Sequence, residues 1–286
     1  MIEKNMMEVA RILNAFAYKD GKDQISTFNN WLQWLCGVFD INKILKNESG
    51  LAGVFASAKN DNEAYFEAMS NWIDIFNEGV MKNGAWDSFG AIYENCFQSK
   101  SKADAMGQFF TPSSVSDLMA KIVAANDVVR RDENGIASYY DCACGSGRTL
   151  VSAWKECNKY AKNFFMGGDL DISSVNMCAL NFMINGMVGA VERRNALSME
   201  WYGGYIVNAC KVPLANDMCG LQWYDDEKEF LRAIQTTKSM MKYWNIEQYD
   251  PNKTKQVVNE PTEVAEPQPT PQQAEKLQPF TQLTLF

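Results

Sequence analysis

The feature that most constrains the fold is a glycine-containing turn at residues 141–150, which read Asp-Cys-Ala-Cys-Gly-Ser-Gly-Arg-Thr-Leu. The apolar and aromatic residues 136–140 precede it and read as a short buried strand, and Leu150 begins the apolar pattern of a helix. Gly145 and Gly147 allow the backbone to turn tightly and to approach a ligand with no Cβ in the way. A strand, a glycine turn and a helix in this order present backbone N–H groups and the positive end of a helix to a polar ligand.

An acidic residue downstream indicates what kind of ligand this is. Residues 164–168 read as a second strand, and Asp169 stands at its expected carboxyl end, 22 residues after Gly147. An acidic side chain about 20 residues past a glycine turn can accept both hydroxyls of a ribose. A tight turn with a purely structural role is the alternative. The pairing of turn and carboxylate favours a ligand that contains a nucleoside.

Two motifs carry a resemblance to a known family. Asp-x-Ala-Cys-Gly-Ser-Gly at residues 141–147 resembles the S-adenosylmethionine loop of the amino-methylating DNA methyltransferases, in particular the modification subunits of type I restriction systems. Gly-Gln-Phe-Phe-Thr-Pro at residues 107–112 resembles the family's other cofactor motif, in the family's order and spacing. The resemblance covers about residues 60–210. It implies an α/β fold: a class I S-adenosylmethionine-dependent methyltransferase (Rossmann-like) domain preceded by a helical domain.

The resemblance also implies a set of cofactor contacts. Where the family places an aspartate after the third strand to receive the adenine amine, this chain has Arg194 and Asn195, and an asparagine oxygen can accept the same bond. The cofactor-binding residues that the resemblance implies are Phe110, Thr111, Pro112, Asp141, Ala143, Gly145, Gly147, Asp169 and Asn195.

The segment after the expected fourth strand, residues 205–207, departs from the family. The family continues with Asn/Asp-Pro-Pro-Phe/Tyr, which holds and stacks on a flipped-out adenine, whereas residues 208–211 here read Asn-Ala-Cys-Lys. Asn208 is in register to accept the target amine and is the catalytic candidate. Two hypotheses stay open. The chain is a DNA methyltransferase acting on adenine N6, or it is a catalytically inactive binding module that acts on the sliding clamp or on a restriction-modification partner.

The rest of the chain predicts the domain organisation. Aromatic and aliphatic residues recur at helical spacing through the N-terminal part, and strands alternate with helices after it, which predicts a parallel, right-handed α/β sheet. The expected units are a helical domain at 1–100, a methyltransferase-like domain at 101–249, a disordered Pro/Gln-rich linker at 250–281 and a partner-binding peptide at 282–286.

The last five residues, Gln-Leu-Thr-Leu-Phe, break the polar character of the linker. They resemble the Gln-Leu-x-Leu-Phe peptide with which bacterial replication and repair proteins dock on the DNA sliding clamp. The resemblance implies polar contacts from Gln282 and apolar anchors from Leu283, Leu285 and Phe286. An accidental apolar end is the alternative.

Composition excludes several classes of function. With no histidine in the chain, Ser-His-Asp and Cys-His catalysis are excluded, and eight scattered cysteines without a paired framework predict neither a metal site nor disulfides. The apolar runs are too short for a membrane span and residues 1–20 lack a signal-peptide pattern, so we expect a cytoplasmic protein with no membrane partner. A net charge of −8 argues against a generic nucleic-acid coat, so DNA binding needs local positive charge or a partner such as a specificity or restriction subunit.

Overall fold

The computed structural model describes residues 2–97, 111–125, 130–157, 162–209 and 220–243. Residues Met1–Ile246 form one compact unit and Glu247–Phe286 a second. Phe110 and the peptide 282–286 lie outside the described residues. Within those residues, no helix is both long enough and apolar enough to cross a membrane.

Residues 2–97 form helices that wrap around a core of aromatic side chains. Trp72 stacks near Phe89 with ring centroids 4.7 Å apart, and Phe28 lies 4.7 Å from Phe97. The rings of Trp31, Trp72, Phe28 and Phe89 are fully buried, so these aromatic stripes form a core. The elements are α1 (Ile2–Asp20), α2 (Gln24–Val38), α3 (Ile41–Lys46), α4 (Gly50–Asp61), α5 (Glu63–Asn83), α6 (Ser88–Ile92) and the π-helix η1 (Tyr93–Phe97).

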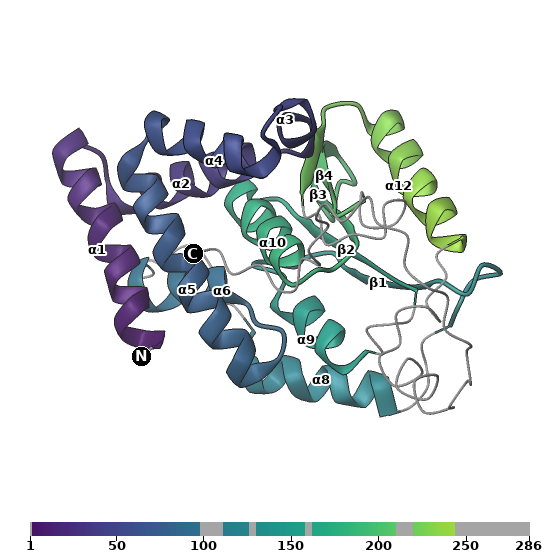
Figure 1. The fold of residues 1–286 in the computed structure, drawn as a ribbon. Coiled ribbons are helices and arrows are strands. Elements are labelled where there is room, and N and C mark those ends of the chain that lie inside the picture. The colour runs from purple at the N-terminus through teal and green to yellow at the C-terminus, as the bar shows by residue number, and fades with distance from the viewer. Residues whose placement is uncertain (1, 98–110, 126–129, 158–161, 210–219, 244–286) are drawn as a thin grey trace, which may run out of the picture. The chain divides into compact units, whose positions relative to one another are not determined.

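A five-stranded sheet with helices on both faces follows (Figure 1). The expectation of an α/β fold is confirmed, while the boundaries of the expected domains stay predictions. The elements are α8 (Ser113–Ala125), β1 (Ala137–Asp141), α9 (Arg148–Glu156), β2 (Asn163–Asp169), α10 (Ile172–Ile184), β3 (Gly189–Arg194), β4 (Trp201–Val207), β5 (Leu221–Tyr224) and α12 (Glu227–Lys242).

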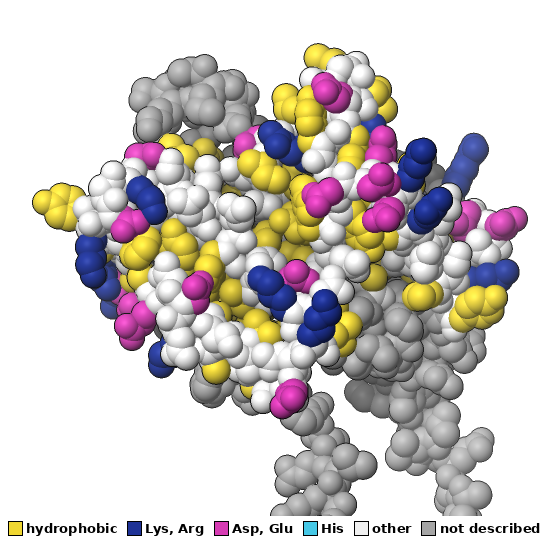
Figure 2. All heavy atoms as spheres, turned by 90° about the horizontal axis from the view of Figure 1, so that it is seen from above, with side chains coloured by type: hydrophobic (Ala, Val, Ile, Leu, Met, Phe, Trp, Pro, Cys, Tyr) yellow, Lys and Arg dark blue, Asp and Glu magenta, His cyan; other side chains and the backbone are white. Residues whose placement is uncertain are grey.

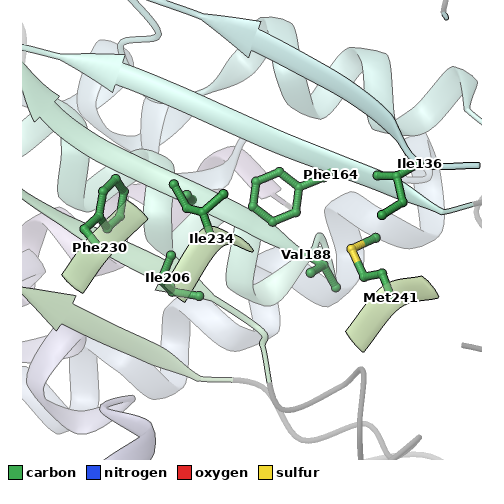
Figure 3. Close-up of a cluster of buried hydrophobic side chains, with 8 residues drawn as sticks. Ile136, Phe164, Val188, Ile206, Phe230, Ile234 and Met241 are labelled. Carbon is green, nitrogen blue, oxygen red and sulfur yellow. The ribbon is translucent and has the colours of Figure 1, made fainter. Parts of the chain in front are cut away.

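The two faces of the sheet are covered by different helices. On one face Tyr139 stacks on Phe165 at 4.7 Å, and Trp154 of α9 and Phe182 of α10 meet the same ring edge-on. On the other face α12 closes an apolar cluster (Figure 3). The cluster consists of Ile136, Phe164, Val188, Ala190, Ile206, Phe230, Ile234 and Met241. The alternation of neighbouring residues 164 and 165 between the faces follows from the two-residue period of a strand.

The prediction of an all-parallel sheet is wrong at its fourth strand. β1, β2 and β3 are parallel neighbours, but β4 runs antiparallel to β3, and β5 runs antiparallel to β4. Only residues 195–200 connect β3 to β4, and the backbone N–H of Asn195 bonds to the carbonyl of Glu200 to close a hairpin. A parallel connection needs a crossover of about a dozen residues or more, so this link is too short for one.

The strand order is β1-β2-β3-β4-β5, which leaves β1 at one edge. Among the described strands, β2 is the only one that pairs with β1, and a single bridge joins Ala137 to Arg131 on the other side. The carboxyl ends of β1 and β2 therefore lie side by side, next to an edge of the sheet.

Candidate functional site at the carboxyl ends of β1 and β2

The turn between β1 and α9 takes a shape that depends on its glycines. Gly145 and Gly147 both have left-handed backbones, with φ of 54° and 84°. A Cβ added to Gly147 would lie 2.7 Å from Sγ of Cys178 on α10, too close for any side chain. The backbone N–H of Cys144 bonds to the carbonyl of Gly168 at 2.9 Å, which ties the turn to β2. The turn thus brings the N-terminus of α9 against the neighbouring strand.

Two carboxylates hold this turn from the ends of the two strands. Asp141 accepts the backbone N–H of Ala143 at 3.1 Å and the hydroxyl of Thr149. Asp169 accepts the backbone N–H of Gly145 at 3.0 Å through Oδ2. The structure therefore brings together five of the residues predicted to bind a cofactor: Asp141, Ala143, Gly145, Gly147 and Asp169.

Burial raises the pKa of Asp169 above the ordinary aspartate value of 3.8, although the backbone N–H groups of Asp171 and Gly145 act in the opposite direction. Its other oxygen accepts the N–H of Asp171 at 2.9 Å. Each carboxylate oxygen can accept two hydrogen bonds, so each keeps room for a ligand hydroxyl. A half-buried carboxylate beside a glycine turn and a helix N-terminus suits a ligand with a vicinal diol and a polar or charged tail.

The upstream motif reaches the site through its last two residues. The carbonyl of Thr111 accepts a hydrogen bond from Arg148, in the first turn of α9, at 3.0 Å. The carbonyl of Pro112 accepts the N–H groups of Val115 and Ser116 and so begins α8. Thr111 therefore lies beside the first turn of α9, next to the glycine turn, and its expected contact with a cofactor stays a prediction.

Asn195 does not offer the acceptor that was expected of it. It begins the β3–β4 turn, and its side-chain oxygen accepts the N–H groups of Leu197 at 3.0 Å and Ser198 at 3.2 Å. Two donors fill the capacity of an amide oxygen. In this structure Asn195 shapes the hairpin, and its side-chain oxygen has no lone pair left for an adenine amine, which argues against the cofactor contact expected of it.

Asn208 lies away from the glycine turn, which argues against the catalytic role expected of it. It follows Val207, which pairs with Gly189 at the amino end of β3, and β4 is the third strand from β1. At a strand spacing of about 4.8 Å, three steps amount to roughly 14 Å. The reason is the hairpin, which reverses the direction of β4. The carboxyl end of β4 therefore lies beside the amino ends of the parallel strands, at the other end from the glycine turn.

The amide of Asn208 is fully engaged in its own surroundings. The residue is 1% exposed. Its Nδ2 donates to the carbonyls of Met183 at 3.1 Å and Met187 at 2.9 Å, and its Oδ1 accepts the N–H of Gly220 at 3.1 Å. Asn208 thus joins the end of α10 to the start of β5, which is a structural role.

Sequence reasoning missed a buried polar network behind the glycine turn. The carboxylate of Asp87, 5% exposed, accepts four hydrogen bonds: from the N–H of Gly90 at 2.8 Å, Asn181 at 2.7 Å, the hydroxyl of Ser146 at 2.7 Å and Arg148 at 2.8 Å. Asp87 before Ser88 fits the pattern of a helix N-cap, with the N–H of Gly90 as its local partner. Its side-chain partners Ser146 and Asn181 lie some 60 to 90 positions away, so no local sequence pattern indicates them.

No cluster of metal-ligating side chains is found among the described residues. Within residues 2–97, 111–125, 130–157, 162–209 and 220–243, three His, Cys, Asp or Glu side chains nowhere gather closely enough to hold an ion. Cys142 is exposed while Cys144 is buried, so the two do not face one another across a shared site.

Comparisons with known proteins identify relatives of this chain. The family model described as N-6 DNA Methylase matches residues 84–256. The chain is 24% identical over 171 residues to the type I restriction enzyme MpnII methylase subunit of Mycoplasma pneumoniae, in an alignment that takes in 56% of this chain and 30% of that protein. The chain therefore spans less than a third of that relative's length.

A solved structure, the methyltransferase subunit of a type I restriction-modification system from Streptococcus thermophilus, aligns over 70% of this chain and 59% of that one, with a TM-score of 0.33 and 16% identity. The family match includes both the glycine turn and Asp87, and it covers more than half of the 286 residues. The chain belongs to the N-6 DNA methylase family.

Proposed function

We propose that the chain binds S-adenosylmethionine at the carboxyl ends of β1 and β2 and serves adenine-N6 methylation of DNA as a cofactor-binding module, without transferring the methyl group by itself. The observation that carries the proposal is a separation in space: the expected cofactor site and the expected catalytic residue Asn208 were predicted to lie together, and they lie apart. The glycine turn and Asp169 lie together, whereas the Asn208 amide is buried at the other end of the sheet.

The residues at the turn fit the cofactor. A Cβ would obstruct the turn at Gly147, and Asp169 keeps acceptor capacity for a ribose diol. When bound, S-adenosylmethionine supplies an electrophilic methyl group. Asp169 would bind the ribose hydroxyls, and the N-terminus of α9 would lie beside the polar part of the ligand.

Methyl transfer needs more than the cofactor. The adenine amine has to be held in line with the methyl group, because transfer by direct attack relies on positioning. Neither Asn208 nor Asn195 provides a free acceptor beside the turn. The described side chains of this chain thus favour binding over transfer, and the amine-orienting group would come from a partner.

Replacing Asp169 by asparagine is expected to weaken binding of S-adenosylhomocysteine by about tenfold or more, because a charged acceptor of ligand hydroxyls is lost. Isothermal titration calorimetry of the full chain measures this. Asp74→Asn is the matched control, since Asp74 is an exposed carboxylate on α5, and it should leave the affinity unchanged. Equal affinities for all three proteins would remove Asp169 from the site.

The pH dependence of binding provides a second prediction. Only the ionised form of Asp169 can accept two ribose hydroxyls, and burial raises its pKa. Affinity should therefore fall on acidification at a pH above the ordinary value of 3.8, and the Asp169→Asn protein should lose this dependence. Titrations between pH 4.5 and 8 check it, and an identical slope in both proteins would contradict it.

The expected partners are DNA and a specificity or restriction subunit, in keeping with a family of DNA methylases. On the face seen in Figure 2, Lys and Arg side chains are interspersed with Asp and Glu side chains. That face offers no continuous basic surface, and the net charge is −8. We propose that a partner supplies most of the affinity for DNA.

The sliding clamp is the second proposed partner, through residues 282–286. Removing these five residues should abolish co-migration with a bacterial sliding clamp in size-exclusion chromatography, because the three apolar anchors go with them. Gln282→Ala together with Phe286→Ala should have the same effect. Unchanged co-migration of the truncated chain would dismiss the clamp as a partner.

A further inference from the structure

Arg148, the first residue of α9, has a guanidinium group buried behind the glycine turn. Its side chain is 8% exposed. Nε donates to Asp87 at 2.8 Å, Nη1 donates to Glu94 at 3.2 Å, and Nη2 donates to the second oxygen of Glu94. A fork of donors that reaches two carboxylates at once is a geometry that arginine can provide and lysine cannot.

The position of this arginine is electrostatically unusual. The N-terminus of a helix carries a partial positive charge, so a cation in the first turn of α9 is disfavoured there. Burial also disfavours the charged form, but Asp87 and Glu94 outweigh it and raise the pKa of Arg148 above its ordinary value. Two carboxylates from α6 and η1 therefore hold a cation at a place where a helix alone would repel one.

The same guanidinium contacts the upstream motif. Nη1 also donates to the backbone carbonyl of Thr111 at 3.0 Å. The next residue, Pro112, begins α8 by accepting the N–H groups of Val115 and Ser116. Arg148 is thus a direct link between the glycine turn and the chain that leads into α8.

We propose that Arg148 is a positioning residue, which holds Thr111 and Pro112 at the cofactor site and so sets the affinity for the adenosyl ligand without touching it. This inference rests on the proposed function. Asp87 and Glu94 act one step further away, since they fix the guanidinium in place. The segment from Asp87 to Phe97 then belongs to the binding site in function, although it lies in the helical part of the chain.

The test is a double-mutant cycle between Arg148→Lys and Glu94→Ala, read out as affinity for S-adenosylhomocysteine. Lysine keeps the positive charge near Asp87 and loses the fork that reaches Thr111, whereas Glu94→Ala removes the carboxylate that fixes the other end of the fork. Each single variant should weaken binding about tenfold, and the double variant also about tenfold, because both release the same guanidinium from the Thr111 carbonyl. A loss of about a hundredfold in the double variant, the product of independent effects, would overturn the proposal. Unchanged affinity in Arg148→Lys would overturn it as well.

Hydrogen exchange of the protein without ligand provides a readout that does not depend on cofactor binding. In Arg148→Lys the amides of Val115 and Ser116 should exchange about tenfold faster, while amides of α5 stay unchanged. Arg232→Lys is the matched control, because Arg232 is exposed on α12, and it should match the parent chain in both measurements. Equal exchange in Arg148→Lys would overturn the positioning role. If the parent chain binds no S-adenosylhomocysteine, the proposed function fails, and exchange alone then decides the role of Arg148.

Discussion

Replacing Asp87 with alanine is expected to lower the free energy of unfolding by about 3–5 kcal/mol, the largest effect of any single substitution considered for this chain. The side chain is 4% exposed and accepts four hydrogen bonds, one of them from the buried guanidinium of Arg148. Alanine would remove one of the two carboxylates that pair with that cation, and would take an acceptor away from the hydroxyl of Ser146 and from one Nδ2 hydrogen of Asn181. Equilibrium unfolding in urea, followed by tryptophan fluorescence and circular dichroism, measures the change.

The matched control for this prediction is Asp74→Ala, an exposed aspartate on α5, which should change stability by no more than about 0.5 kcal/mol. Asp87→Asn should lie between the two, because the single amide oxygen can replace only one of the two carboxylate oxygens and the neutral amide no longer balances the charge of Arg148. A loss below about 1 kcal/mol in Asp87→Ala would show that the network contributes little to the fold.

Replacing Asn208 with alanine should cost about 2–4 kcal/mol of stability, and this is the second large effect. The substitution takes away the acceptor of the Gly220 N–H and the Nδ2 donor to the Met187 carbonyl, at about 1–3 kcal/mol for a buried unsatisfied group, while the Met183 carbonyl keeps the N–H of Gly186. It also puts alanine at φ 55°, a left-handed conformation that asparagine adopts more readily.

Asn60→Ala, at an exposed position on α4, is the control and should be close to neutral. This prediction separates the two roles considered for Asn208. If Asn208 orients a substrate amine, its replacement should abolish activity and change stability little. If it joins α10 to β5, its replacement should lower stability strongly. An Asn208→Ala protein as stable as its parent would return Asn208 to the list of catalytic candidates.

The part of the site that the sequence predicts correctly is the part with local signals. The second strand was expected at 164–168 and extends from Asn163 to Asp169, and the glycine turn lies between a strand and a helix as expected. Glycine positions, a carboxylate at a fixed distance and a period of two in the strands all depend on neighbours in the chain. Such local signals can be read from a single sequence.

The parts that failed depend on distant segments. The direction of β4 was inferred from the alternation of strands and helices, although residues 195–200 are too few for a parallel crossover and already indicate a hairpin. The catalytic role expected of Asn208 came instead from the resemblance to the family, which does not reveal the buried partners of its amide. The links from Asp87 to Ser146 and Asn181 join segments that share no local pattern, so only the folded chain shows them.

The measurement that tests the central claim most directly follows a labelled methyl group. Purified full-length chain is incubated with S-adenosylmethionine carrying a radioactive methyl group and with unmethylated DNA, and label is counted separately on protein and on DNA. We expect saturable label on the protein, displaced by unlabelled S-adenosylhomocysteine and lost in Asp169→Asn, with label on DNA at the level of a sample without protein. Label on DNA that rises with time would contradict the separation of cofactor site and transfer site, and absence of displaceable label on the protein would contradict the cofactor site itself.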